Sequence, residues 1–397
     1  MSFKLLGSVL LIVGTSIGAG MLGLPIAAAQ LGFVGSLILL FLCWFVMTAS
    51  AFLILEVNLW FPQNNNLISM AKQTIGPVGQ IIAWLTYLLL LYALLCAYIA
   101  GGSDLFQHLL KACGIQIPTW ASSIIFTLIF GLIVYLGIRS VDYVNRGLMF
   151  VKLSAYFVLV IMLIPFVSLE KLADGNLLYI TSASALTVTA TAFGYAIIIP
   201  SLRIYFEGDI KKLKTAIIIG STIPLICYIG WDAVIMGVIP LNGEHSLVSI
   251  LHSPNSTSDL VTTLDTAVAK PSINIVVKLF TSICVLTSFL GVSLCLTDFF
   301  ADGLQIEKKG PGGIAISLLT FIPALVIVLY CPSIFIKALE YAGIYAIILL
   351  ILLPAWMAWC GRYRRGFSNG FIVRGGKSLL IILIIVSVML IVKGIMG

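Results

Sequence analysis

The 397-residue sequence has few charged side chains, because Asp, Glu, Lys and Arg together make up only 9% of it. A soluble globular domain carries roughly 25% charged residues, so this composition excludes an ordinary soluble protein. The eight cysteines show no paired spacing, and there are only three histidines. The sequence therefore contains no disulfide framework, no metal-ligand spacing and no nucleophile motif. We expect no metal, no cofactor and no enzymatic activity.

Apolar residues are abundant instead, at 61% of the chain with a mean hydropathy of +1.16. They gather in segments long enough to cross a bilayer, which takes roughly 20 residues. The sequence thus predicts an all-α polytopic membrane protein held in a lipid bilayer, with eleven transmembrane helices at about 5–29, 32–58, 78–107, 119–138, 147–168, 184–206, 213–239, 273–301, 313–331, 335–360 and 378–396.

The basic residues sort these segments by side. With the N-terminus inside, 16 of the 22 Lys and Arg residues fall on the inner side and 6 on the outer side. The positive-inside rule therefore places the N-terminus in the cytoplasm and the C-terminus in the periplasm. The net charge of +7 reflects this loop distribution, and we expect no nucleic-acid partner and no obligate protein partner.

Three stretches between the apolar segments have features of their own. Residues 59–77 favour a short interfacial helix on the cytoplasmic side, and residues 240–272 include a helical pattern from Asp259 to Ala269 that would cover the outer mouth. Residues 361–377 are basic, which favours contact with lipid headgroups.

The first apolar segment has an unusual centre, Gly14-Thr15-Ser16-Ile17-Gly18-Ala19-Gly20-Met21-Leu22-Gly23-Leu24-Pro25. Each Gly costs a helix about 1 kcal/mol relative to Ala, and Pro removes a hydrogen-bond donor. An opened backbone inside a membrane is tolerated only where protein surrounds it or where it lines a cavity. We expect residues 17–22 to be non-helical and to form a solute site. The alternative is close helix packing through small residues.

The sixth segment repeats this signature around Gly194, with Pro200 six residues later, and predicts a second break at about 193–197. Five helices per half, starting in the cytoplasm, make the second half inverted. The expected units are residues 1–168 (helices 1–5), residues 184–360 (helices 6–10) and an extra helix at 378–396. Paired broken helices in inverted halves are typical of a secondary transporter, and we expect the two breaks to face each other.

Several motifs over nearly the whole chain, in the same order, resemble the bacterial aromatic amino acid permeases, the tyrosine-specific permeases first and the tryptophan permeases next. They are Gly14 to Met21, Leu55-Glu56-Val57, Pro200-Ser201-Leu202, Thr287 to Val292 and Gly375-Gly376-Lys377. The resemblance implies the amino acid–polyamine–organocation superfamily and a leucine-transporter-like 5+5 inverted repeat plus one helix. It also implies proton-driven import of an aromatic amino acid, tyrosine before tryptophan or phenylalanine, across the inner membrane.

One position departs from this family. A histidine tends to follow the Phe-Gly-aromatic run of helix 6 there, whereas this chain has Ala196. Any role of that histidine in selectivity or proton handling cannot be transferred.

An amino acid substrate presents a carboxylate and an ammonium group to its site. An opened first helix offers backbone N–H groups to the carboxylate, helped by the dipole of the half-helix. The candidates are Gly18, Ala19, Gly20 and Met21. Carbonyl groups near the two breaks suit the ammonium, at Thr15, Ser16, Ala192 and Phe193. Phe193 and Tyr195 are the expected walls for an apolar substrate side chain. Gly194, Tyr92 and Ser288 are further candidates for substrate binding.

Lys152 lies more than one turn inside the fifth helix. An ionisable residue within the membrane is costly and marks a functional site by default. In proton-driven relatives of the superfamily an amine on the fifth helix takes the place of sodium, which the resemblance transfers to Lys152. We expect its amine to lie near the carbonyls of residues 14–17. The alternatives are snorkelling to the interface and, through the hydroxyls of Thr287 and Ser288, a sodium-coupled symporter.

The remaining intramembrane charges are less informative. Glu56, Asp298 and Asp302 lie near cytoplasmic helix ends, where they either pair with Arg203 and other bases or remain solvated. Asp232 and Glu340 lie deeper, and the sequence names no partner for them. A function of another class, an amino acid sensor or a channel, is disfavoured because the paired breaks predict a closed, alternating site.

Overall fold

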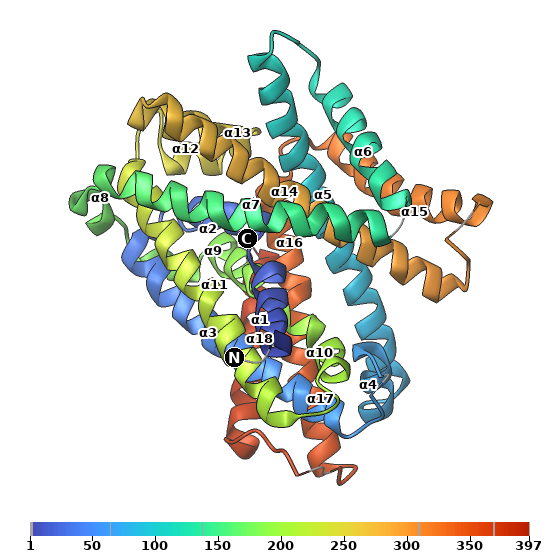
Figure 1. The fold of residues 1–397 in the computed structure, drawn as a ribbon. Coiled ribbons are helices and arrows are strands. Elements are labelled where there is room, and N and C mark those ends of the chain that lie inside the picture. Colours follow the sequence, from blue (N-terminus) through green and yellow to red (C-terminus); the bar gives the residue numbers. More distant parts are fainter. Residues whose placement is uncertain (1–2, 64, 137, 309, 368–369, 397) are drawn as a thin grey trace.

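The computed structural model describes residues 3–396 except residues 64, 137, 309, 368 and 369. Helices alone make up its regular structure over these residues (Figure 1). The described part of the chain contains nine helices long and apolar enough to cross a membrane, or ten when a bent pair at the N-terminus is counted as one span. The all-α membrane fold is therefore confirmed.

The bent pair consists of α1 (Phe3–Ser16) and α2 (Ala19–Ala27), which meet at an angle of 50°. The other spans are α3 (Gly32–Leu59), α5 (Pro77–Ala112), most of α7 (Ile138–Leu163), the run α9–η3–α10 (Ala183–Tyr205), α11 (Ile210–Val238), α14 (Pro271–Leu304), α15 (Gly310–Tyr330), the run α16–η4–α17 (Phe335–Tyr363) and α18 (Gly376–Met396). Helix α6 (Thr119–Tyr135) is apolar but only 17 residues long. The count of eleven crossings and the inverted repeat therefore remain predictions.

Both expected breaks are present, but the first is shorter than the sequence predicted, and the second contains a 3₁₀ turn. In the first segment only Ile17 and Gly18 lie outside a helix, and α2 contains Gly20, Gly23 and Pro25. In the sixth segment α9 ends at Ala192 and a 3₁₀ turn, η3 (Gly194–Ile198), leads into α10 (Ile199–Tyr205). Every residue of α2 is buried, so its packing outweighs the low helix propensity of its glycines.

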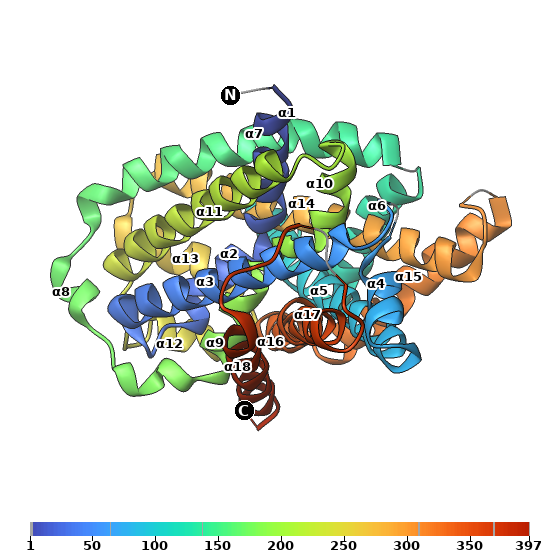
Figure 2. The ribbon, with the colours of Figure 1, turned by 90° about the horizontal axis from the view of Figure 1, so that it is seen from below.

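The two broken segments lie in the middle of the bundle. Helix α2 packs against α9, and α1 packs against η3 and α11. Helix α7 packs against α14 and also contacts α11, and Figure 1 shows it crossing α14. Viewed from below, α1 enters from the edge of the bundle opposite to the C-terminus (Figure 2). The breaks are thus surrounded by α3, α7, α11 and α14.

The two ends of the bundle differ. Helices α12 (Leu247–Leu251) and α13 (Ser256–Val268) cover the upper end in Figure 1, where the Asp104 carboxylate accepts hydrogen bonds from Thr257 and Ser258 at the start of α13. Helix α4 (Leu67–Thr74), α10 and α17 (Leu353–Tyr363) lie at the lower end. The helices expected in residues 59–77 and from Asp259 to Ala269 are confirmed as α4 and α13.

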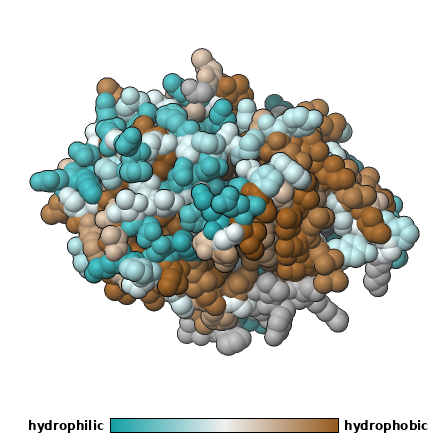
Figure 3. All heavy atoms as spheres, turned by 90° about the horizontal axis from the view of Figure 1, so that it is seen from above, coloured by the Kyte–Doolittle hydropathy of each residue, from teal (hydrophilic) through white to brown (hydrophobic). Residues whose placement is uncertain are grey.

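Apolar side chains cover much of the outside of the molecule. Seen from above, polar residues gather over one part of the face and apolar residues flank it (Figure 3). The exposed apolar side chains include Phe41 and Phe45 of α3, Leu128 of α6 and Phe150 of α7. A surface of this kind matches hydrocarbon on its flanks and water at its ends.

Candidate functional site

The break between α1 and α2 leaves backbone groups without helical partners, and three distant side chains bind them. The Tyr228 hydroxyl donates to Ser16 O at 2.7 Å, and Lys152 Nζ donates to Ile17 O at 2.6 Å. Ala19 N donates to Ser288 Oγ at 2.9 Å. These side chains come from α11, α7 and α14, so the broken segment is held by three helices at once.

This arrangement follows from the cost of an unpaired backbone group away from water. Gly18 has an extended backbone (φ −157°, ψ −154°) and ends the helical hydrogen bonding. A Cβ atom on Gly18 would lie 2.3 Å from Ser288 Oγ. Glycine therefore allows Ser288 to approach closely enough to cap α2 from another helix.

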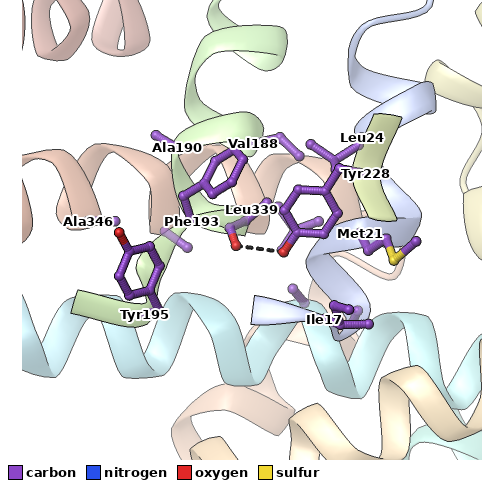
Figure 4. Close-up of a cluster of buried hydrophobic side chains, with 14 of the residues drawn as sticks. Ile17, Met21, Leu24, Val188, Ala190, Phe193, Tyr195, Tyr228, Leu339 and Ala346 are labelled. Carbon is purple, nitrogen blue, oxygen red and sulfur yellow. Dashed lines mark hydrogen bonds between the residues drawn. The ribbon is translucent and has the colours of Figure 1, made fainter. Parts of the chain in front are cut away.

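Tyr228 joins the two breaks. Besides Ser16 O, its hydroxyl lies 2.8 Å from Ala192 O, the last carbonyl of α9. Its ring is buried and packs edge-on against Phe193 with centroids 5.2 Å apart. Figure 4 shows this pair beside Met21, with the hydrogen bond of the phenol dashed. Tyr228 is not predictable from the sequence, because an aromatic residue in a continuous apolar helix carries no local signal.

Lys152 is deeply buried, with 1% of its side chain exposed. Its amine donates to Thr287 Oγ1 at 3.2 Å in addition to Ile17 O. Within the described residues no carboxylate lies within 4.0 Å of it. The expected position near the carbonyls of residues 14–17 is confirmed, whereas snorkelling to an interface is excluded by this burial.

Two backbone amides of the first break have no hydrogen-bond acceptor in the described part of the chain. Over the described residues, the N–H groups of Gly18 and Gly20 make no hydrogen bond, although both residues are buried. A Cβ atom on Gly20 would lie 3.8 Å from Ala192 Cα. Gly20 therefore lies in contact distance of the end of α9.

Other predicted site residues lie further from this centre. Thr15 is exposed, and its hydroxyl donates to Ile12 O. The Ser16 hydroxyl also donates to Ile12 O, so Ser16 contributes only its carbonyl. The Tyr92 hydroxyl donates to Leu319 O of α15. None of these side chains points at the free amides.

The residues of the second break have different surroundings. Tyr195 shares a hydrogen bond of 2.9 Å with Thr48 of α3, and Figure 4 shows it apart from the Phe193–Tyr228 pair. Gly194 has open space beside it, since the nearest atom to an added Cβ would be a Leu350 methyl at 4.0 Å. Phe193 and Met21 thus lie beside Tyr228 at the breaks, whereas Tyr195 anchors the second broken segment to α3.

A cavity of about 450 Å³ lies at the end of the bundle that holds α4 and α10. Its lining includes both polar and aromatic side chains, among them Tyr87, Ser201, Cys295, Asp298 and Asp302. Ile197 of η3 and Pro200 of α10 also line it. The cavity therefore reaches the second broken segment from this end.

Four of the remaining intramembrane acidic residues have ionic or hydrogen-bonding partners in the structure. Glu56 pairs with Arg362, not with Arg203, and Arg203 donates instead to the backbone oxygens of Asn58 and Phe61. Asp298 pairs with Lys308. Asp232 accepts a hydrogen bond of 2.5 Å from Ser36, and Glu340 accepts one from Ser184. No group of three or more His, Cys, Asp or Glu side chains suited to a metal ion occurs over the described residues.

Comparison with known proteins identifies the family of this chain. A family model described as tryptophan/tyrosine permease matches residues 1–393. The chain is 36% identical over 390 residues to the tyrosine-specific transport system 1 of Haemophilus influenzae, covering 98% of this chain and 95% of the relative. It is 30% identical to a tryptophan-specific transport protein of the same organism, over 94% of each. It is also 33% identical to the glutamine transporter 2 of Aliivibrio fischeri, over 90% of this chain and 89% of that one. The chain belongs to the tryptophan/tyrosine permease family.

Proposed function

We propose that this protein imports an aromatic L-amino acid, tyrosine before tryptophan or phenylalanine, by proton symport with alternating access. The relatives named for tyrosine and tryptophan support the substrate class. A relative at 33% identity is named for glutamine, so identity alone does not fix the substrate. The choice depends on the chemistry of the site.

The observation that carries this proposal is that unbonded backbone amides and carbonyls bound by a hydroxyl meet at the two breaks. The free amides of Gly18 and Gly20 are available to a carboxylate, and α2 begins beside them. The carbonyls of Ser16 and Ala192 lie within reach of one hydroxyl, so one ammonium group can bind both. Backbone recognition of this kind selects the α-amino acid group and leaves the side chain to other contacts.

The substrate side chain would meet apolar and aromatic surface. Phe193, Met21 and Tyr228 are buried around the breaks, and none of them carries a charge. A charged substrate side chain would have no ionic partner among these three residues and would lose its hydration. A flat aromatic side chain fits such walls, because ring pairs add stabilisation beyond the area they bury.

Lys152 supplies the proposed coupling site. Its amine has no counter-ion among the described residues and only two hydrogen-bond acceptors, Ile17 O and Thr287 Oγ1. A neutral amine has two N–H donors, which matches these two acceptors, whereas an ammonium has three. Proton binding and release at Lys152 would therefore change how tightly α7 holds the first break.

The sodium alternative is weakened by the same contacts. Ile17 O and Thr287 Oγ1 are oxygen atoms of the type that bind a small cation, and the amine nitrogen already lies against both. A sodium ion at this position would have to displace the amine. We therefore assign the coupling to protons.

Alternating access would proceed through the two different ends of the bundle. Helices α12 and α13 lie at one end, whereas the 450 Å³ cavity reaches the second break from the other. We assign the cavity end to the cytoplasm, in agreement with the inner N-terminus that the basic residues predict. Counting the bent pair and α6 as crossings gives eleven helices in the bacterial inner membrane.

Uptake of labelled tyrosine into proteoliposomes tests this function. We expect saturable accumulation driven by an inward proton gradient without sodium, competition by tryptophan and phenylalanine, and none by charged amino acids. Non-saturable flux would indicate a channel, and binding without flux would indicate a sensor. Accumulation that requires sodium and ignores the proton gradient would contradict the coupling.

A further inference from the structure

In this structure both types of backbone group at the breaks are already bound by side-chain hydroxyls. The Tyr228 hydroxyl donates toward Ser16 O and Ala192 O at 2.7 and 2.8 Å. Ser288 Oγ accepts from Ala19 N at 2.9 Å. The first hydroxyl acts as a donor to two carbonyls, as an ammonium does, and the second acts as an acceptor for an amide, as a carboxylate does.

We propose that Tyr228 and Ser288 replace the substrate's ammonium and carboxylate when the carrier is empty, so that the empty carrier can close and return. This inference rests on the proposed function. A symporter accumulates substrate only if it crosses back without substrate. During that return the opened backbone groups would be buried with no partner, which is costly inside a membrane. The two hydroxyls remove that cost.

The chemistry also explains why a substrate displaces these hydroxyls. A phenol has one proton, and Tyr228 must share it between two carbonyls. An ammonium has three protons and donates to both fully, through charge-assisted hydrogen bonds that are about twice as strong as neutral ones. A carboxylate likewise outcompetes a serine hydroxyl for the Ala19 amide and can also bind the free amides of Gly18 and Gly20.

Both side chains are held beside the breaks by their own helices. Tyr228 packs on Phe193, and its ring is fully buried. Ser288 is half-buried on α14, next to Thr287, which binds Lys152. Tyr98 of α5 lies beside Ser288 as a further polar neighbour. The Ser288 hydroxyl can turn away from Ala19 N by rotation about its Cα–Cβ bond. The Tyr228 oxygen is fixed in the plane of its ring, so the whole Tyr228 side chain must shift to free the two carbonyls.

The test compares Tyr228→Phe with the wild type in proteoliposomes. Phe keeps the ring packing and removes the hydroxyl. We expect substrate exchange to be retained, net gradient-driven uptake to fall at least fivefold, and substrate to bind about three- to tenfold more tightly because its competitor is gone. Tyr156→Phe is the matched control, since its hydroxyl also donates to a buried carbonyl, Cys227 O, but not at a break. It should leave all three values unchanged.

Several results would overturn the proposal. Wild-type net uptake together with unchanged affinity in Tyr228→Phe would show that the hydroxyl does not serve the empty carrier. Loss of exchange along with net uptake, in a variant that stays monodisperse in detergent, would show that Tyr228 is needed while substrate is bound. If Tyr228→Phe does not fold, Ser288→Ala decides by the same readouts. Failure of the proposed function itself is distinct, because the wild type would then transport no amino acid.

Discussion

The amine of Lys152 and the carbonyl oxygen of Ile17 lie 2.6 Å apart, although 135 residues separate them in the chain. This contact joins α7 to the one place where the first segment leaves its helix. The carbonyl is available only because Gly18 ends the helical hydrogen bonding. The break and the buried amine thus form one structural unit, and a change in either one alters the surroundings of the other.

Replacing Lys152 should therefore separate transport from coupling. We expect Lys152→Ala to keep exchange and to lose gradient-driven accumulation by at least about tenfold, within the usual range of coupling free energies of about 1–3 kcal/mol. Lys152→Arg should fail too, because a guanidinium keeps its proton throughout. Uptake into proteoliposomes with and without a pH gradient measures exchange and accumulation for both variants. Intact pH-driven accumulation in Lys152→Ala would contradict the role of the amine.

Gly20 should tolerate one methyl group but not three carbon atoms. An added Cβ atom would lie in ordinary contact with Ala192 Cα, at 3.8 Å. Gly20→Ala should thus remain folded and retain part of its substrate binding. The branches of Gly20→Val would press on α9 or fill the space beside the free amides, and we expect binding to fall at least about tenfold, the effect of roughly 1.4 kcal/mol. Detergent monodispersity controls for folding. Wild-type uptake by the Gly20→Val variant would show that the substrate carboxylate does not bind at this position.

Cys295 gives a chemical test of the cavity. It lines the cavity and is exposed, as are Cys113 and Cys331, which do not line it. A membrane-permeant maleimide should block uptake by modifying Cys295, and Cys295→Ser should be resistant. Cys113→Ser and Cys331→Ser should remain as sensitive as the wild type. Equal inhibition of the Cys295→Ser variant would show that substrate does not pass this cavity.

How far the sequence predicted this structure depended on whether the signal was local. The glycines at Gly18 and Gly20 and the pair Gly194–Pro200 located both breaks, because they disfavour helix wherever they occur. Lys152 was also predictable, since a buried amine must find oxygen partners. The length of the first break could not be predicted from the sequence, because only the packing of α2 shows that its glycines remain helical.

Local sequence patterns could not predict the contacts between distant segments. Tyr228 and Ser16 are 212 residues apart, and nothing in the sequence around Tyr228 differs from an ordinary apolar helix. Glu56 was expected near bases, yet only the fold selects Arg362 over Arg203. Thr15 and Tyr92 were placed in the site by their nearness to a break or by type, and the structure turns their hydroxyls toward other carbonyls.

The Glu56–Arg362 pair should be the most sensitive ion pair of the described chain. The guanidinium donates to both carboxylate oxygens at 2.7 and 2.5 Å, and the two side chains are only 0% and 6% exposed. Val373 N also donates to Glu56 at 2.7 Å, which ties the segment after α17 to α3. Glu56→Gln would leave the Arg362 charge buried without compensation, a loss of about 3–5 kcal/mol.

The exposed pair Lys4–Glu207 provides the control, because its side chains are 58% and 81% exposed. Exposed pairs contribute about 0–1 kcal/mol, so Lys4→Ala should unfold close to the wild-type temperature in detergent. Glu56→Gln should unfold well below it, and Glu56→Gln combined with Arg362→Gln should recover part of the loss, since the unpaired charge is then gone. Equal melting temperatures for Glu56→Gln and Lys4→Ala would show that the buried pair does not hold the end of the bundle near α4 and α17 together.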